Sequence, residues 1–127
     1  MSEEEMEAVA NLNVLANVHY QDGRNGEAAV LFAQALAIRE RHLDPEHPDV
    51  RLSINNLANC YRNLRRWAEA EPLYRRSLAM RERQLGADSP ELAANLRNLA
   101  TVCRPLGKDQ EADALEARAS SLTADKV

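Results

Sequence analysis

Apolar residues recur at helical spacing along most of the chain, and polar residues fill the positions between them. One such row consists of Ile54, Leu57, Ala58 and Tyr61. The next segment repeats the pattern at Trp67, Ala70, Leu73, Tyr74, Ser77 and Leu78. Residues at spacings of three, four and seven share one face of a helix, so each segment is predicted to be an amphipathic helix.

This pattern returns after 42 residues. Leu-Ala-Asn at 15–17 recurs at 57–59, and Leu-Ala-Thr follows at 99–101. The segment AIRERHL at 37–43 returns as AMRERQL at 79–85. A fixed period of this length is typical of solenoids, in which stacked units share one continuous core.

Capping and turn residues lie where a helix-turn-helix unit needs them. Ser2 and Glu5 have the spacing of a capping box, and Ser89 precedes Pro90 as an N-cap precedes the first residue of a helix. Glycines at 23, 86 and 107 mark turns or helix ends. We expect Pro105 to end its helix about a turn sooner than in the two earlier units.

These features predict an all-α protein, an α-solenoid of three stacked helix-turn-helix units with about six helices. We expect a single domain over residues 1–127. The repeats are expected at about 6–47, 48–89 and 90–123. The low aromatic content, 4%, also favours helices over sheets.

The third unit departs from the other two. Glu116 stands where Phe32 and Tyr74 stand in the earlier units, and Ser120 replaces two leucines. A polar last helix suits a terminal cap. It would also result if the chain were a fragment of a longer array whose next repeat covered that helix.

The repeated motifs resemble a known family. NNLANCY, EAEPLYRRSL and the long linking segment LAIRERHLDPEHPDV are similar to the tetratricopeptide repeats of kinesin light chains and their relatives, and the likeness extends from about Met6 to Leu122. The resemblance implies that the α-solenoid is right-handed and that the first helices of the units line a concave groove. It also implies binding of short acidic segments with a central Trp. Nothing resembles the coiled-coil region that joins such light chains to a motor.

The first helices carry polar rows at the positions that the resemblance places in the groove. These rows comprise Val9, Asn13, Asn17 and Tyr20, then Arg51, Asn55, Asn59 and Arg62, then Ala93, Arg97, Thr101 and Arg104, with Asn56 and Asn98 beside them. The rows contain no Asp or Glu, although the chain has a net charge of -4. Asn can grip a peptide backbone and Arg can bind carboxylates. We therefore expect a short, extended, acidic peptide as the ligand.

Two other interpretations remain open. The polar rows could be an ordinary solvated face, or Asn17 and Asn59 could fix the stacking of neighbouring helices. Alternatively, the chain could be a structural block that forms homo-oligomers through its ends. Apolar residues are found at both ends of the repeat array, at Met6, Val9, Ala10 and Val14 and at Ala114, Leu115, Ala117 and Leu122.

Catalytic motifs are missing from the sequence, so we expect no enzyme, cofactor or metal site. No Gly-rich phosphate loop and no HExxH motif occurs. His19 and Cys103 take the register position of Tyr61, and Cys60 takes that of Val18, so we expect these residues in the core.

Charge and hydropathy exclude further classes. The acidic balance argues against nonspecific nucleic-acid binding, and no apolar run reaches the ~20 residues needed to span a bilayer. The acidic N-terminus lacks the basic region of a signal peptide, and the two cysteines form no CxxC pair. We expect a cytoplasmic protein with protein or peptide partners, and no nucleic-acid or membrane partner.

Overall fold

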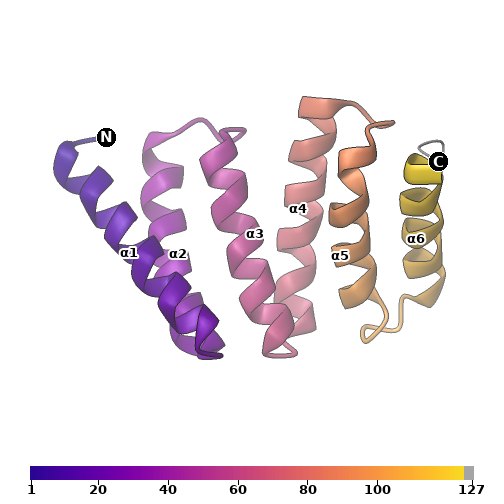
Figure 1. The fold of residues 1–127 in the computed structure, drawn as a ribbon, viewed down its shortest axis with the longest axis horizontal. Coiled ribbons are helices and arrows are strands. Elements are labelled where there is room, and N and C mark those ends of the chain that lie inside the picture. The colour runs from indigo at the N-terminus through magenta and orange to yellow at the C-terminus, as the bar shows by residue number, and fades with distance from the viewer. Residues whose placement is uncertain (125–127) are drawn as a thin grey trace. The chain divides into compact units, whose positions relative to one another are not determined.

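The computed structural model describes residues 1–124 and is helical throughout (Figure 1). Its elements are α1 (Glu3–Gln21), α2 (Asn25–His42), α3 (Pro48–Asn63), α4 (Trp67–Leu85), the 3₁₀ helix η1 (Pro90–Leu92), α5 (Ala93–Cys103) and α6 (Asp109–Ala124). The six α-helices confirm the predicted all-α class. The last three residues of the predicted domain, 125–127, lie outside the described residues.

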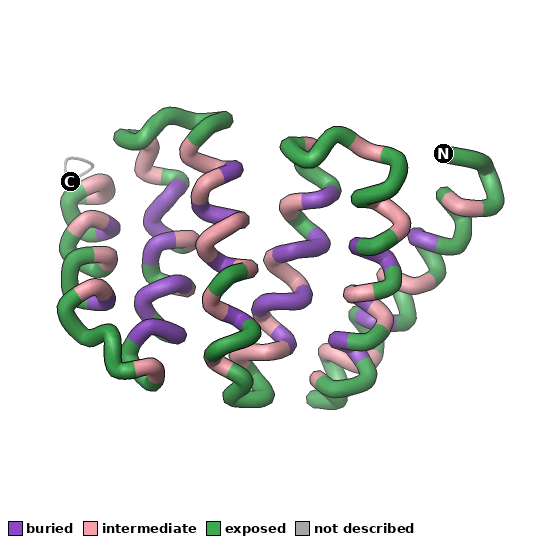
Figure 2. The backbone as a smooth tube through the Cα atoms, turned by 180° about the vertical axis from the view of Figure 1, so that it is seen from behind, coloured by how far each residue is buried: buried purple, intermediate pink, exposed green. Residues whose placement is uncertain are grey.

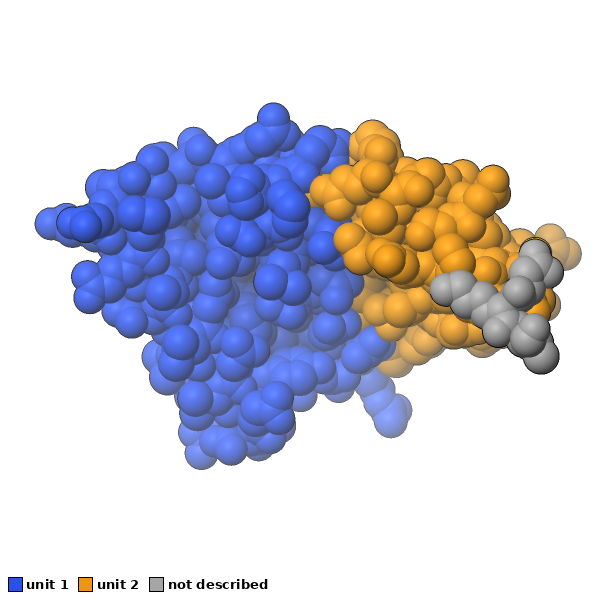
Figure 3. All heavy atoms as spheres, turned by 45° about the horizontal axis from the view of Figure 1, so that its top comes forward, with its two compact units in different colours: residues 1–66 blue, residues 67–127 orange. Residues whose placement is uncertain are grey.

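The chain divides into two compact units (Figure 3). The first unit, residues 1–66, contains α1 to α3, and α2 packs on both α1 and α3. The second unit, residues 67–127, contains α4 to α6, and α5 packs on both α4 and α6. The division falls between α3 and α4, the two helices of the predicted second repeat. The repeat boundaries therefore stay a prediction from sequence.

Local capping chemistry sets the helix ends as the sequence predicts. Ser2 Oγ accepts a hydrogen bond from the Glu5 backbone N–H at 3.1 Å, and Glu5 Oε1 accepts one from the Ser2 backbone N–H at 3.3 Å. This is the complete capping box. Gly86 follows α4 with φ +86°, a backbone conformation that costs glycine little.

The fifth helix departs from the earlier units at both ends. It begins as the short helix η1, where Ser89 Oγ accepts the Glu91 N–H at 3.3 Å. It ends at Cys103, two residues before the position that matches the ends of α1 and α3. Pro105 shortens the helix as predicted, but by roughly half a turn rather than a full turn.

Small residues lie where helices pack closely. The fully buried alanines occupy matching positions in successive units, at Ala16, Ala58 and Ala100, at Ala28, Ala70 and Ala112, and at Ala35 and Ala119. Phe32 and Tyr74 are also buried. Buried positions run along one side of each helix, as Figure 2 shows, which is the amphipathic pattern of the sequence.

Helix α1 is the exception to this regularity. Leu15 is 48% exposed and Val18 is 52% exposed, whereas their register equivalents Leu57 and Cys60 are 6% and 0% exposed. The expectation that Val18 lies in the core is therefore wrong. Among the described residues no helix precedes α1, and burial at these positions requires a neighbouring helix.

No helix within residues 1–124 combines the length and the apolar character required to cross a membrane.

Candidate functional site

A small pocket in the first unit gathers part of the predicted polar rows. It has a volume of about 110 Å³. Its lining consists of Asn17, Tyr20 and Gln21 from α1, Phe32 from α2, and Asn56 and Asn59 from α3. Four of these side chains, Asn17, Tyr20, Asn56 and Asn59, belong to the rows predicted from sequence.

Two carboxamides in the pocket have hydrogen-bonding capacity to spare. Neither Asn17 nor Asn56 has a hydrogen-bond partner within residues 1–124. Each amide offers two N–H donors and one carbonyl acceptor. Tyr20 is more constrained, because its hydroxyl accepts a hydrogen bond from Asn63 Nδ2 at 3.3 Å. The pocket can therefore both donate hydrogen bonds to a bound chain and accept them.

Asn13 and Asn55 occupy the same register position on α1 and α3, and both are half-buried. The Oδ1 atom of each is buried without a hydrogen-bond partner in the described part of the chain. An unsatisfied buried acceptor costs about 1–3 kcal/mol. A ligand that supplies an N–H group would remove this cost.

The other predicted residues of the first unit are half-buried rather than fully exposed. Arg51 and Arg62 on α3 both fall in this class, and both already make contacts within the chain. Each of them therefore already has a partner within the protein, although the buried Nε atom of Arg51 has none among the described residues.

In the second unit, Arg97 keeps its charge available. Its side chain is exposed and has no ion-pair partner among residues 1–124. The Thr101 hydroxyl donates a hydrogen bond to the Arg97 carbonyl at 2.9 Å, which is a local bond within α5. Asn98 is half-buried and makes contacts within the chain.

Arg104 is paired with acidic residues of its own unit. Its Nη2 atom lies 2.8 Å from Asp113 Oδ1 and 2.7 Å from Glu116 Oε2, both on α6. These hydrogen bonds raise the pKa of Arg104. Sequence reasoning considered only the first helices and therefore missed these carboxylates.

Gln21 and Phe32 were also missed as pocket residues. Gln21 follows Asn17 by four positions, so helical spacing could have placed it on the same face. Phe32 is a buried core residue of α2, and it also lines the pocket. No sequence signal distinguishes a core aromatic residue from one that forms the wall of a pocket.

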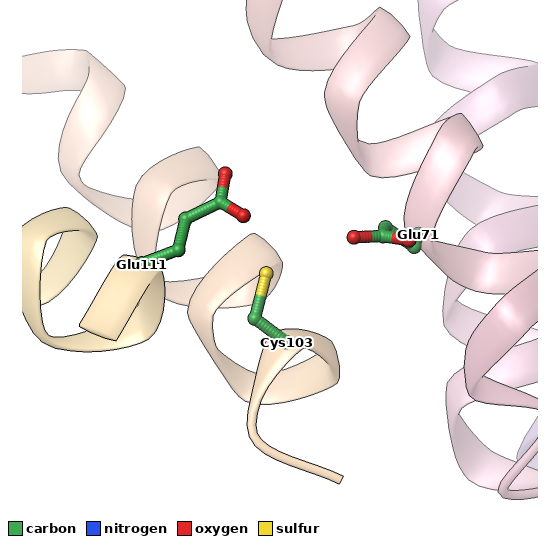
Figure 4. Close-up of side chains that lie close together, drawn as sticks. All are labelled: Glu71, Cys103 and Glu111. Atoms are coloured by element: carbon green, nitrogen blue, oxygen red, sulfur yellow. The ribbon is translucent and has the colours of Figure 1, made fainter. Parts of the chain in front are cut away.

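A second cluster lies where α4, α5 and α6 meet within the second unit (Figure 4). One carboxylate oxygen each from Glu71 and Glu111 and the sulfur of Cys103 lie within 4.8 Å of one another. These residue types can bind metal ions. Whether the carboxylates are available to a metal ion depends on the positively charged side chains beside them.

Arg75 and Lys108 already occupy the two carboxylates. Arg75 donates to Glu111 at 2.7 and 2.8 Å and to Glu71 at 2.8 Å, and Lys108 donates to Glu71 at 2.6 Å. Two cations therefore balance two anions, and a metal ion would have to displace them. Burial raises the pKa of the Cys103 thiol, and Glu111 adds to that effect. The cluster is an ion-pair network that links the helices around a protonated thiol.

This network should make the free energy of unfolding depend on pH. Hydrogen bonds from Lys108 and Arg75 lower the pKa of Glu71, so its stabilising effect is present above the unfolded-state pKa of about 4.3 and is lost as pH falls below it. We expect Glu71→Gln to reduce the free energy of unfolding by about 1–2 kcal/mol at pH 7. The difference from wild type should shrink toward pH 3.

Urea denaturation at both pH values measures this effect. Glu7→Gln is a suitable control, because Glu7 is exposed and has no partner among the described residues. A deficit in Glu71→Gln that is equally large at pH 3 and pH 7 would contradict the assignment.

Two profiles of the tetratricopeptide repeat match the sequence, over residues 51–124 and residues 12–49. Among solved structures, a proposed kinesin light chain from Podosopora anserina superposes with a TM-score of 0.83 at 27% identity. Its TPR-like repeats are nearly identical to one another. That match covers 100% of this chain and 59% of the other. This chain therefore spans less than two thirds of that relative.

More distant structures share the fold alone. The N-terminal domain of stress-induced protein-1 from C. elegans superposes with a TM-score of 0.68 at 19% identity, over 95% of this chain and 88% of that domain. BtubC from P. vanneervenii superposes with a TM-score of 0.57 at 22% identity, over 93% and 64% of the respective chains. A comparison with curated protein sequences gave no significant match. The superpositions confirm a TPR-like solenoid fold.

Proposed function

Because this chain belongs to the tetratricopeptide repeat family, whose units generally serve as protein–protein interaction scaffolds and are typically non-catalytic, we propose that it binds a short, extended, acidic peptide. The proposed site is a concave groove lined by the first helices of the repeats. The pocket that contains the unpaired amides of Asn17 and Asn56 carries this proposal.

The chemistry of the pocket suits a peptide backbone. An extended chain presents N–H and C=O groups that have no partners of their own. Asn17 and Asn56 can pair with both kinds of group. The buried Oδ1 atoms of Asn13 and Asn55 could accept hydrogen bonds from the N–H groups of the same peptide.

The preference for acidic peptides rests on arginine. Arg97 is exposed without an ion-pair partner among the described residues, and Arg62 is half-buried on α3. Guanidinium groups bind carboxylates through two parallel hydrogen bonds. Arg104 contributes less, because Asp113 and Glu116 already neutralise its charge.

Charge substitution in the pocket tests the proposal. Asn17→Asp combined with Asn56→Asp keeps the side-chain shape but removes the N–H donors and adds two negative charges. We expect affinity for acidic peptides, selected from a random peptide array, to fall by about tenfold or more, because like charges repel across an interface. Isothermal titration calorimetry measures the change.

The matched control is Gln34→Glu combined with Gln110→Glu, which adds the same two negative charges at exposed positions of α2 and α6 outside the pocket. Its affinity for the same peptides should equal that of wild type. If the two Asn substitutions also leave affinity unchanged, the pocket is not the peptide site.

A further inference from the structure

A second pocket of the first unit lies toward the other end of α1 from the pocket of Asn17 and Asn56. It has a volume of about 260 Å³. Two charged residues line it, Arg39 of α2 and Asp49 of α3, and we name it the Arg39 pocket. The rest of its lining is apolar and includes Met6, Val9, Ala10 and Leu43.

The guanidinium group of Arg39 is half-buried and has no carboxylate partner. Its Nη1 atom donates to Ser53 Oγ at 2.7 Å and to the Asp49 carbonyl at 3.1 Å, and both acceptors are neutral. Its Nε and Nη2 atoms have no acceptor within residues 1–124, and Arg39 makes no ion pair there. A charge that is partly removed from water is costly unless an opposite charge lies beside it. The Arg39 pocket therefore offers donors and an uncompensated positive charge to a bound anion.

The carboxylate of Asp49 also lacks a donor. Its Oδ2 atom lies 3.9 Å from His47 Nδ1. That nitrogen accepts the backbone N–H of Asp49 at 3.0 Å, so it has no proton to donate to the carboxylate. Because Arg39 reaches only the backbone carbonyl of Asp49, the two charged side chains do not neutralise each other.

The matching residues of the second unit form a closed ion pair. Arg81 takes the register position of Arg39, and Glu91 takes that of Asp49. Arg81 Nη2 lies 3.3 Å from Glu91 Oε2. Glutamate is one methylene longer than aspartate, so the shorter side chain of Asp49 leaves the pair open in the first unit. This open pair is what distinguishes the Arg39 pocket.

The Arg39 pocket does not depend on what precedes α1. Met6 and Ala10 take the register positions of Pro48 and Leu52 on α3. Pro48 is exposed and Leu52 is 48% exposed, although α2 precedes α3 and packs on it. A helix that packed on α1 in the same way would therefore leave Met6 and Ala10 uncovered.

We propose that the Arg39 pocket binds a free apolar α-amino acid. Its carboxylate pairs with Arg39, its ammonium group pairs with Asp49, and its side chain lies against the apolar lining. Pockets for drug-sized ligands measure about 300–1,000 Å³, so a volume of about 260 Å³ suits a smaller molecule. The proposal concerns a separate site and does not depend on the peptide pocket.

The two charges favour a free amino acid over a peptide. Within a peptide, the α-amino and α-carboxyl groups are consumed in amide bonds, and each end of the chain keeps only one of them. A free amino acid carries both charges and an apolar side chain on a single carbon atom. It therefore matches the open pair and the apolar lining at once.

L-Leucine is the probe, and methionine methyl signals report where it binds. In protein labelled with ¹³C at the methionine methyl groups, the Met6 signal should shift and saturate on addition of L-leucine. Met80 is buried in α4 of the second unit, so its signal should stay in place. Leucinamide lacks the carboxylate and isocaproate lacks the ammonium group, so each should bind about tenfold more weakly or worse.

Two substitutions with matched controls test the geometry. Arg39→Gln should weaken binding of L-leucine by about tenfold or more, whereas Arg41→Gln removes the same charge at an exposed position of α2 and should have no effect. Because Arg39 also contacts Ser53, a second variant leaves it in place. Ala10→Phe fills the pocket from an exposed position and should abolish binding, and Ala37→Phe, at an exposed position of α2, should not. Circular dichroism should show the same helix content in all four variants.

Any of three results would overturn the proposal. The first is a Met6 signal that does not saturate with L-leucine, and the second is unchanged binding in Ala10→Phe. The third is tighter binding of glycyl-leucine than of L-leucine. The dipeptide has an amide in place of the ammonium group of leucine, so this result would assign the pocket to the C-terminal residue of a peptide. Acidic peptides should bind Ala10→Phe as tightly as wild type, which separates this test from that of the peptide pocket.

Discussion

Phe32→Ala should lower the free energy of unfolding by about 3–5 kcal/mol. Phe32 is only 1% exposed and lies in α2, which packs on both α1 and α3. Its truncation leaves a cavity in the first unit and removes a wall of the pocket. Small domains have total stabilities of about 5–15 kcal/mol, so this change would remove a large share.

Urea denaturation followed by circular dichroism measures this loss. The matched control is Glu116→Ala, because Glu116 takes the same register position in α6 but is exposed. It loses only a solvent-exposed ion pair with Arg104, and ion pairs of this kind contribute little to stability. If both variants lost the same free energy of unfolding, this repeat position would not be part of the core in α2 and exposed in α6, and the account would be contradicted.

Reversal of two arginine charges should have the largest effect on binding. We expect Arg62→Glu combined with Arg97→Glu to weaken acidic peptides by about a hundredfold, since each lost charged hydrogen bond contributes about 1.5–3 kcal/mol. Helix content should stay the same, because Arg97 is exposed and Arg62 is half-buried. Fluorescence anisotropy with an acidic peptide measures the affinity.

Net charge alone could also repel an acidic ligand, so the control must change it equally. Arg24→Glu combined with Arg41→Glu makes the same change at two exposed positions outside the predicted rows. This control should bind within about twofold of wild type at physiological salt, where distant charges are screened. Equal weakening in both double variants would mean that the effect is general repulsion rather than recognition.

Local chemistry made much of the fold predictable from sequence. The capping box of Ser2 and Glu5 and the glycine after α4 act within a few residues, and the structure contains both. The 42-residue period predicted six helices, because equivalent residues make equivalent contacts. The structure departs from the prediction mainly where contacts with other helices determine whether a side chain is buried or paired.

The exposure of Leu15 and Val18 is such a case. The register assigns them the role of Leu57 and Cys60, but burial is a property of the neighbouring helix rather than of the residue. Sequence periodicity identifies an apolar position without showing whether anything covers it.

The candidate site was predictable only in part, for the same reason. Helical spacing within α1 and α3 grouped Asn17 with Tyr20 and Asn56 with Asn59, and the structure places all four around one pocket. The pairing of Arg104 depends on carboxylates from α6, which no pattern within α5 reveals.

The central claim is that the amides of Asn17 and Asn56 contact an acidic peptide. The most direct measurement is an NMR titration of the ¹⁵N-labelled protein that follows the side-chain NH₂ signals of these two residues. We predict that both signals shift and saturate with an acidic peptide from the array, and do not shift with the same peptide after its acidic residues are replaced by Lys. If the acidic peptide binds while both signals stay in place, the proposed site is wrong.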